Sequence, residues 1–429
     1  MTDTIFALSS GQVPAAIGVI RISGPKAFVA VEALAGSLPP PRRASLRTLR
    51  TKDAHLDRAL VLIFPGPETA TGEDLAELHV HGGRAVVRAI ESALSTVPGL
   101  RSAEAGEFTR RALGNGRIDL TEAEGLADLL AAETEAQRRA AMRAAEGGMR
   151  QRIGNWATRT LQFSAAIEAL LDHADEDDIA AEAGLLDQVR ADARTLAAEI
   201  EALLAEPGIE RLRDGIRVVL AGSPNAGKST LLNALVGREA AIVSPLAGTT
   251  RDRIEAPVMR DGVAYLLTDT AGLHDAPSDM VEEIGIVRAK EALDQADLIL
   301  WLDDIPPPAL TAPHILIHPR TDEPGRGAIV DGRLRVSART GEGMAQLWER
   351  IAELAGAMLP TPDAIPFNRR QRDLAALAAA SLCGVAEGSD LLLIAEELRR
   401  ALRAFDRITG AADVEAMLDT LFGRFCIGK

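Results

Sequence analysis

The stretch that decides the fold is Ile216–Ser229, IRVVLAGSPNAGKS, near the middle of the chain. An apolar, β-like run leads into Gly222–Ser229, which has the pattern G-x-x-x-x-G-K-[ST], and the helical run TLLNALVG follows. A strand, this loop and a helix in that order predict a phosphate-binding loop, in which backbone N–H groups and the helix N-terminus hold phosphate oxygens. We expect Lys228 to contact the β and γ phosphates and Ser229 to ligate Mg²⁺. A chance match in a glycine-rich turn is the alternative, and the flanking strand and helix argue against it.

Two motifs further along the chain fit the same site. Gly248–Asp252 reads GTTRD, where Thr250 offers a hydroxyl to Mg²⁺ and the γ-phosphate. Asp269–Gly272 reads DTAG at the end of a β-like run, where Asp269 helps to hold Mg²⁺ and Gly272 brings its N–H to the γ-phosphate. Together these motifs resemble GTPases of the translation-factor-related class. The nucleotide contacts that we expect are Asn225, Ala226, Gly227, Lys228, Ser229, Thr230, Ser244, Pro245, Leu246, Ala247, Gly248, Thr249, Thr250, Asp269, Thr270, Ala271, Gly272, Asp322, Ser337, Ala338 and Arg339.

The base-reading motif departs from the pattern of that class, which carries Asn-Lys-x-Asp after the fourth strand. Here the same place reads Pro-Arg-Thr-Asp and ends at Asp322, whose carboxylate can accept both guanine N–H groups. The stem of Arg320 can cover the base as a lysine does, and His318 can serve if the register shifts by one residue. A loop at Gly341–Gly343, within SARTGEG, fits beside the base. We expect guanine preference with weakened affinity; an ordinary loop carboxylate at Asp322 is the alternative.

The residue after DTAG bears on hydrolysis. Ras-like proteins place a water-orienting glutamine there, whereas this chain has Leu273, which cannot hydrogen-bond. The water must therefore be oriented from elsewhere, and a cation must offset the charge of the transition state.

Around the phosphate-binding loop, the sequence predicts an α/β plus all-α architecture. Residues 215–357 alternate β-like runs with helical ones, which is typical of a parallel-sheet P-loop domain. Residues 1–118 alternate in the same way and predict a second α/β domain. Strands are expected there at Ile17–Ser23 and Leu60–Phe64, and a helix at Gly83–Leu94.

The two remaining segments, 119–214 and 358–429, are alanine-rich, with apolar residues at helical spacing. Because their textures are alike, we expect one helical domain into which residues 215–357 are inserted. Two separate helical domains are the alternative, and the sequence does not decide between them.

Composition excludes several classes of protein. The chain has 429 residues, 47% of them hydrophobic, so it can bury several cores and is not largely disordered. Its net charge of -15 excludes a surface that binds nucleic acid nonspecifically, so any such contact needs a local basic patch. Two cysteines, Cys383 and Cys426, do not make a disulfide framework. The N-terminal stretch predicts neither a signal peptide nor a membrane span, and we expect a cytoplasmic protein.

Motifs along nearly the whole chain resemble the MnmE (TrmE) family of tRNA-modification GTPases. They are RISG at Arg21–Gly24, TGED at Thr71–Asp74, HGG at His81–Gly83, GEFTRRA at Gly106–Ala112, NGRIDLTEAE at Asn115–Glu124, PNAGKS at Pro224–Ser229 and CIGK at Cys426–Lys429. The resemblance implies a homodimer whose N-terminal domain binds folate, and a flavoprotein partner, MnmG (GidA), in a heterotetramer. Together they add an aminomethyl or carboxymethylaminomethyl group to C5 of the tRNA wobble uridine. The implied one-carbon carrier is 5,10-methylenetetrahydrofolate or 5-formyltetrahydrofolate.

The resemblance also implies the missing parts of the hydrolytic machinery. A potassium ion takes the place of an arginine finger and is held by Asn225, Ser244, Leu246 and Thr249. A glutamate orients the water and matches Glu282, with Glu283 as the alternative; Lys228 and Asn225 complete the implied catalytic set. The other interpretations are a turn residue for Asn225 and a solvated helix charge for Glu282.

The resemblance maps a folate site onto Arg21, Glu77, Arg117 and Lys429. A carboxylate can pair with the amide-like edge of a pterin, and cations can bind the carboxylates of the glutamyl tail. Cys426 would lie near the one-carbon unit, or is simply a small buried residue.

Two arginine clusters are candidates for contact with tRNA, and solvated helix faces are the alternative interpretation. The clusters are Arg369, Arg370 and Arg372, and Arg399, Arg400, Arg403 and Arg407. The alternative function is a ribosome-assembly GTPase that acts as a nucleotide-gated RNA-binding switch, against which the folate motifs and the CIGK tail argue. A membrane-associated iron-transport GTPase would need membrane spans.

Overall fold

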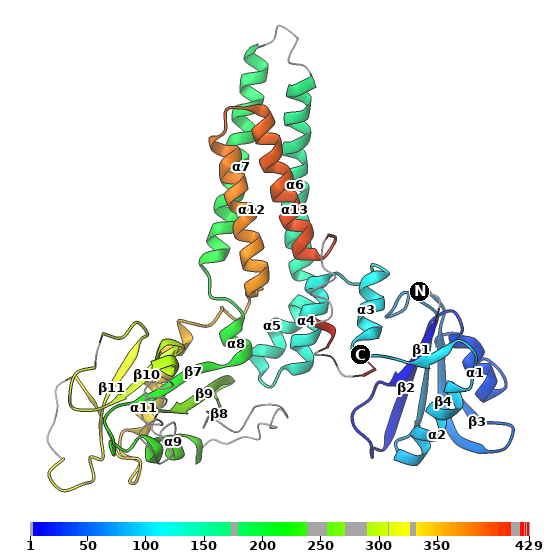
Figure 1. Cartoon of the computed structure of the whole chain (residues 1–429), viewed down its shortest axis with the longest axis horizontal. Helices are drawn as coiled ribbons and strands as arrows, with labels where there is room; N and C mark the ends of the chain where they lie inside the picture. The colour runs from blue at the N-terminus through cyan, green and yellow to red at the C-terminus, as the bar shows by residue number, and fades with distance from the viewer. Residues whose placement is uncertain are drawn as a thin grey trace, which may run out of the picture. The chain divides into compact units, whose positions relative to one another are not determined.

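A computed structural model describes most of the chain. The described residues are 3–172, 179–237, 255–270, 290–307, 309–326, 332–412, 421–423, 425 and 427–428. The chain forms two compact units (Figure 1). The first comprises Met1–Leu130, Met142–Leu196 and Leu377–Lys429, and the second comprises Ala131–Ala141 and Ala197–Ala376.

The first unit begins with a six-stranded sheet of order β3-β4-β5-β2-β1-β6. Neighbouring strands are antiparallel except for the parallel pair β1–β6. The strands are β1 (Thr4–Leu8), β2 (Ile17–Ser23), β3 (Ser45–Arg50), β4 (His55–Phe64), β5 (Leu75–His81) and β6 (Leu100–Ser102). The helices are α1 (Ala27–Ala35), α2 (Arg84–Ser95) and α3 (Glu107–Gly114). The predicted α/β domain is confirmed, and the predicted strand Leu60–Phe64 is the second half of the longer β4.

Alternation along the strands gives this sheet two different faces. In β2, Ile20 and Ile22 are fully buried in the core that includes Ile90 of α2. The intervening Arg21 points to the other face, as the period of two in a strand requires. That face carries Arg21 and Glu77, two of the residues predicted to bind folate.

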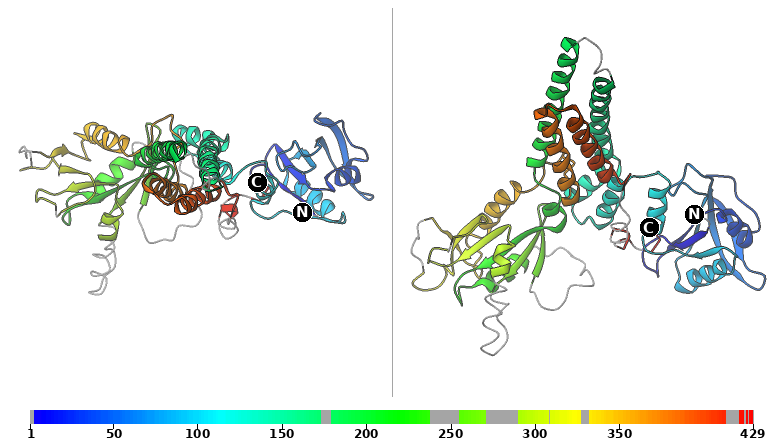
Figure 2. Two further views of the ribbon diagram at one scale, coloured as in Figure 1. Left: turned by 90° about the horizontal axis from the view of Figure 1, so that it is seen from above. Right: turned by 45° about the horizontal axis from the view of Figure 1, so that its top comes forward.

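Helices from before and after the predicted insertion pack together in the first unit. Helix α6 (Gly148–Asp172) lies beside α13 (Leu391–Thr409), and Figure 2 shows this pairing from two further directions. The rings of Trp156 and Phe405 meet there with centroids 6.0 Å apart. This contact favours one helical domain. The residues of four further helices are divided between the two units: α4 (Leu120–Ala131), α5 (Glu135–Ala145), α7 (Ile179–Ala205) and α12 (Arg369–Glu387).

The second unit holds a sheet of order β12-β11-β10-β7-β9-β8. Its strands are β7 (Ile216–Ala221), β8 (Glu255–Arg260), β9 (Val263–Asp269), β10 (Leu298–Leu302), β11 (His314–Pro319) and β12 (Leu334–Val336), and its helices are α8 (Glu210–Asp214), α9 (Lys228–Gly237) and α11 (Met344–Gly356). The predicted P-loop fold with a parallel sheet is confirmed, and one pair at the sheet edge is the exception. The edge strand β8 runs antiparallel to β9, because the two-residue turn Asp261–Gly262, with φ of 49° and 79°, folds it back as a hairpin.

Candidate functional site: a nucleotide edge and an N-terminal pocket

The predicted nucleotide residues gather at the carboxyl edge of the second sheet. Loops leave this edge after β7, β9, β10, β11 and β12, and each of these five strands is joined to at least one neighbour by a parallel ladder. Ligands of such sheets bind outside the carboxyl ends of the strands. The arrangement therefore places the phosphate-binding loop, Asp269, Asp322 and Ser337 at one edge.

The phosphate-binding loop starts where two strands approach closely. Gly222 has φ of 143°, and a Cβ on it would lie 2.4 Å from the carbonyl oxygen of Leu302 at the end of β10. Only glycine fits this backbone without displacing β10. Asn225 in the same loop adopts φ of 61°, which asparagine tolerates better than most residues.

The side chains of this loop are arranged around phosphate chemistry. The Lys228 ammonium donates to the carbonyl oxygens of Gly222 and Ser223, both at 3.0 Å, and burial lowers the pKa of Lys228. The Ser229 hydroxyl donates to the Asp269 carboxylate. The two groups that we expect at Mg²⁺ therefore touch, although they are 40 positions apart in sequence.

Beside the loop, the structure brings the base-reading residues together. The Ser337 hydroxyl donates to Asp322 Oδ1 at 2.6 Å, and this hydrogen bond is the main cause that lowers the pKa of Asp322. The stem of Arg320 lies against the phosphate-binding loop: a Cβ on Gly227 would be 3.5 Å from Arg320 Cγ. This placement suits a stem that covers the base.

His318 does not fit the shifted register that the sequence left open. The ring is buried, its Nδ1 lies 2.7 Å from Asp304 Oδ1, and its Nε2 lies 3.0 Å from the Arg326 carbonyl oxygen. Both ring nitrogens are therefore occupied by the protein.

Sequence reasoning missed Asp303, which follows β10. Its carboxylate accepts hydrogen bonds from the backbone N–H and the hydroxyl of Ser223, so it anchors the start of the phosphate-binding loop. These hydrogen bonds outweigh burial and lower the pKa of Asp303. The sequence feature that could have indicated this role is the acidic pair Asp303 and Asp304, directly after the apolar run LILWL.

Several predicted residues lie outside the described part of the chain. They are Ser244, Pro245, Leu246, Ala247, Gly248, Thr249, Thr250, Ala271, Gly272, Leu273, Glu282, Glu283, Cys426 and Lys429. Their roles remain predictions.

The N-terminal sheet carries a separate polar site. Arg21 and Glu77 face each other across β2 and β5, with Arg21 Nη2 3.0 Å from Glu77 Oε1. Burial alone would raise the pKa of Glu77, but hydrogen bonds from His79 and Arg21 outweigh it, and the pKa lies below its ordinary value. Glu77 is therefore held as a carboxylate.

A pocket of about 250 Å³ adjoins this pair. Its lining includes Glu77, Glu68, Phe64 and Arg42. Arg117 forms a two-point ion pair with Glu68, at 3.2 and 3.1 Å. Three of the four residues predicted to bind folate thus either line the pocket or bond to a residue that does, whereas Arg42 and Glu68 were not predicted from the sequence.

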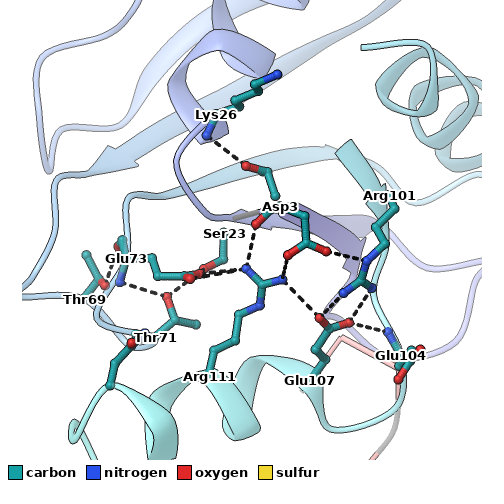
Figure 3. A network of polar contacts seen from close by, with 12 residues as sticks. Asp3, Ser23, Lys26, Thr69, Thr71, Glu73, Arg101, Glu104, Glu107 and Arg111 are labelled. Atoms are coloured by element: carbon teal, nitrogen blue, oxygen red, sulfur yellow. Dashed lines mark hydrogen bonds and ion pairs between the residues drawn. The ribbon is translucent and has the colours of Figure 1, made fainter. Parts of the chain in front are cut away.

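A buried ion cluster supports the loop beside this pocket (Figure 3). The Arg111 side chain is 0% exposed and bonds to Asp3, Glu73 and Glu107. Glu73 belongs to the Thr71–Asp74 motif, so Arg111 ties α3 to the loop that precedes β5. The motifs GEFTRRA and TGED therefore serve, at least in these residues, to position the pocket wall.

The arginine clusters proposed for tRNA are largely engaged by the protein itself. Arg399, Arg400 and Arg403 pair with glutamates of their own helix, chiefly Glu396. Arg372 donates to backbone carbonyl oxygens at Leu204 and Glu206. These contacts favour the alternative interpretation of ion-paired helix faces. Among the described residues, none of the helices is both long and apolar enough to cross a membrane.

Two family models together match most of the chain. Residues 4–117 match the model of the GTP-binding protein TrmE N-terminus, and residues 120–426 match that of the MnmE helical domain. The chain is 55% identical over 430 residues to the tRNA modification GTPase MnmE of Erythrobacter litoralis and 53% identical over 439 residues to that of Novosphingobium aromaticivorans, with 100% of each chain covered. It also aligns with the G domain of the T. maritima FeoB iron transporter at 27% identity and a TM-score of 0.24, over 33% of this chain and 98% of that one. From the two domain models and these full-length relatives, we conclude that the chain belongs to the MnmE family of tRNA modification GTPases.

Proposed function

We propose that this chain is a potassium-activated GTP hydrolase that, with a flavoprotein of the MnmG (GidA) kind, modifies C5 of the tRNA wobble uridine. Hydrolysis of GTP with Mg²⁺, in the service of tRNA modification, follows from membership of the family. The potassium ion, the flavoprotein partner, the homodimer and the folate-borne one-carbon unit are the further content of the proposal.

The observation that carries it is the presence of two unlike sites in one chain. The second unit has a phosphate-binding loop with Ser229 bonded to Asp269, which suits a magnesium nucleotide. The first unit has a pocket whose charged side chains are Arg42, Glu68 and Glu77, which suits a ligand with a hydrogen-bonding ring and an anionic tail. A nucleotide switch alone would not need the second site.

The N-terminal residues fit a reduced folate by their donor chemistry. Glu77, held ionised by Arg21 and His79, can accept the paired N–H groups of a pterin edge. Phe64 gives the pocket an aromatic wall, and Arg117 and Arg42 can bind carboxylates of a glutamyl tail. When bound, methylenetetrahydrofolate supplies the one-carbon unit, while these side chains bind and orient it.

In the GTP site, the residues of this chain position the phosphates and offset their charge. Lys228 can transfer its hydrogen bonds from the two loop carbonyl oxygens to phosphate oxygens. Because Leu273 cannot orient water, we assign that role to Glu282 and the charge compensation to potassium at Asn225.

The test is mass analysis of wobble nucleosides in a strain that lacks this protein. The wild-type chain and the surface control Glu349→Gln should restore the modified uridine, whereas Lys228→Ala and Glu77→Gln should not. Normal modification with Glu77→Gln would remove the folate pocket from the proposal. Unchanged wobble nucleosides in the deletion strain, with altered ribosome assembly, would favour the alternative function.

A further inference from the structure

The base-reading motif of this chain begins with Pro319, a residue that cannot donate a hydrogen bond to hold the loop in place. Where GTPases of this class carry the asparagine of Asn-Lys-x-Asp, this chain has Pro319, which lacks both a side-chain amide and a backbone N–H. The Asp322 carboxylate must still be held in one orientation to read a base, because a bidentate contact tolerates little rotation.

Next to Asp322, a hydrogen bond joins two loops of the second unit. The Thr321 hydroxyl donates to Glu342 Oε2 at 2.9 Å, joining the loop after β11 to the loop after β12. Thr321 is only 7% exposed, so solvent competes little for its hydroxyl. Thr321 immediately precedes Asp322 in the chain, so the hydroxyl anchors the backbone that carries the carboxylate.

The acceptor end of this hydrogen bond is itself held. The Glu342 carbonyl oxygen accepts from the Ser337 N–H at 2.9 Å, and Glu342 Oε1 lies 3.3 Å from Arg335 Nη2. A Cβ on Gly343, which has φ of 74°, would lie 1.8 Å from the Arg335 carbonyl oxygen. The loop after β12 therefore packs closely against β12, which holds Glu342 in place.

Ser337 completes the connection to Asp322. Its hydroxyl donates to Asp322 Oδ1 at 2.6 Å and accepts from the Thr340 N–H at 3.1 Å. Because a hydroxyl has one proton, the accepted hydrogen bond from Thr340 leaves that proton for Asp322. Thr321 thus holds the backbone beside Asp322, and Ser337 holds the Asp322 carboxylate.

We infer that Thr321 and Glu342 are positioning residues that replace the missing asparagine, and that through Ser337 they set the Asp322 carboxylate for selective binding of the guanine exocyclic amine. This inference rests on the proposed function, in which Asp322 reads the base. It concerns base selectivity and leaves the phosphate contacts of Lys228 and Ser229 unaffected.

The experiment compares the dissociation constants of GDP and IDP for the full-length chain by calorimetry, since inosine lacks the exocyclic amine. Thr321→Val should lower the preference for GDP over IDP about fivefold, which is the order of magnitude of one hydrogen bond. Thr321→Ser keeps the hydroxyl and should retain the preference. Glu342→Ala, which also removes the contact with Arg335, should lower the preference at least as far as Thr321→Val. The double variant should lose no more than Glu342→Ala, because both changes remove the same hydrogen bond between Thr321 and Glu342. Glu349→Ala on α11 is the surface control.

The outcomes separate the inference from the proposal on which it rests. If Thr321→Val weakens the binding of GDP and IDP equally, or leaves the preference for GDP unchanged, Thr321 is not a positioning residue for Asp322. A hydroxyl with a merely structural role would lower the unfolding temperature without altering this preference. If Asp322→Asn also leaves the preference unchanged, the base site itself is misassigned. If Asp322→Asn abolishes the preference and Thr321→Val does not, the positioning role of Thr321 alone fails.

Discussion

The Ser9 hydroxyl donates a hydrogen bond to the carbonyl oxygen of Gly428 at 2.7 Å, across 419 positions of sequence. Next to it, Ile427 forms an antiparallel bridge with Ala105. Gly428 has φ of 99°, and a Cβ there would lie 2.2 Å from the Leu8 carbonyl oxygen, so the approach requires glycine. Ile427 and Gly428 of the CIGK motif therefore contact the N-terminal domain.

Deletion of residues 426–429 should abolish tetrahydrofolate binding while GTP turnover stays near wild type, because Ile427 and Gly428 contact the N-terminal domain, to which we assign the folate site. Ser9→Ala should weaken folate binding by a smaller factor, about fivefold, by removing one hydrogen bond. Fluorescence titration of folate beside phosphate release measures both. Intact folate binding in the truncated chain would separate the tail from the pocket.

Arg111→Met should lower the free energy of unfolding of the N-terminal domain by about 3–5 kcal/mol, because it leaves Glu73 without its buried cation and Glu107 with Arg101 alone. The matched control is Arg117→Met, whose partner Glu68 is largely exposed, and which should cost about 0–1 kcal/mol. Hydrogen exchange of the amides of β1 and β5 in the full chain reports both values. Equal costs for the two variants would contradict the burial argument.

Asp322→Asn should weaken GDP binding about 10- to 100-fold, because an amide N–H replaces an acceptor of two charge-assisted hydrogen bonds. The same variant should bind xanthosine diphosphate more tightly than the wild type, since xanthine offers a carbonyl oxygen to the new N–H. Calorimetry with both nucleotides tests this. Unchanged affinity for GDP would show that Pro319–Asp322 does not read the base.

Asn225→Ala should remove the stimulation of GTP turnover by potassium over sodium, because alanine offers no side-chain oxygen. Asn225→Asp keeps an oxygen and tolerates the left-handed backbone at this position, so it should retain part of the stimulation. Phosphate release in matched potassium and sodium buffers is the measurement. Equal turnover of the wild type in both salts would rule the ion out.

Sequence patterns located the elements whose physics is local. Ile17–Ser23 was predicted with its observed bounds, because its alternating apolar residues are flanked by clear breaks. Strand β8 was missed because Pro257 interrupts Glu255–Arg260, and proline is usually excluded from strands. The strand forms nonetheless at the sheet edge, where a proline without an N–H is tolerated.

The phosphate-binding loop could be predicted from the sequence alone, because all of its parts lie within one short segment. These parts are a strand, a turn that needs glycine and a helix N-terminus. The contacts between Arg117 and Glu68, Thr321 and Glu342, and Ser9 and Gly428 could not be predicted, because the two residues of each pair lie on different segments of the chain. Only strand order and register bring such residues within hydrogen-bonding distance, and these depend on burial summed over the whole domain. The sequence motifs therefore indicated the chemistry of each site, while the tertiary structure determined which partner holds each functional group in place.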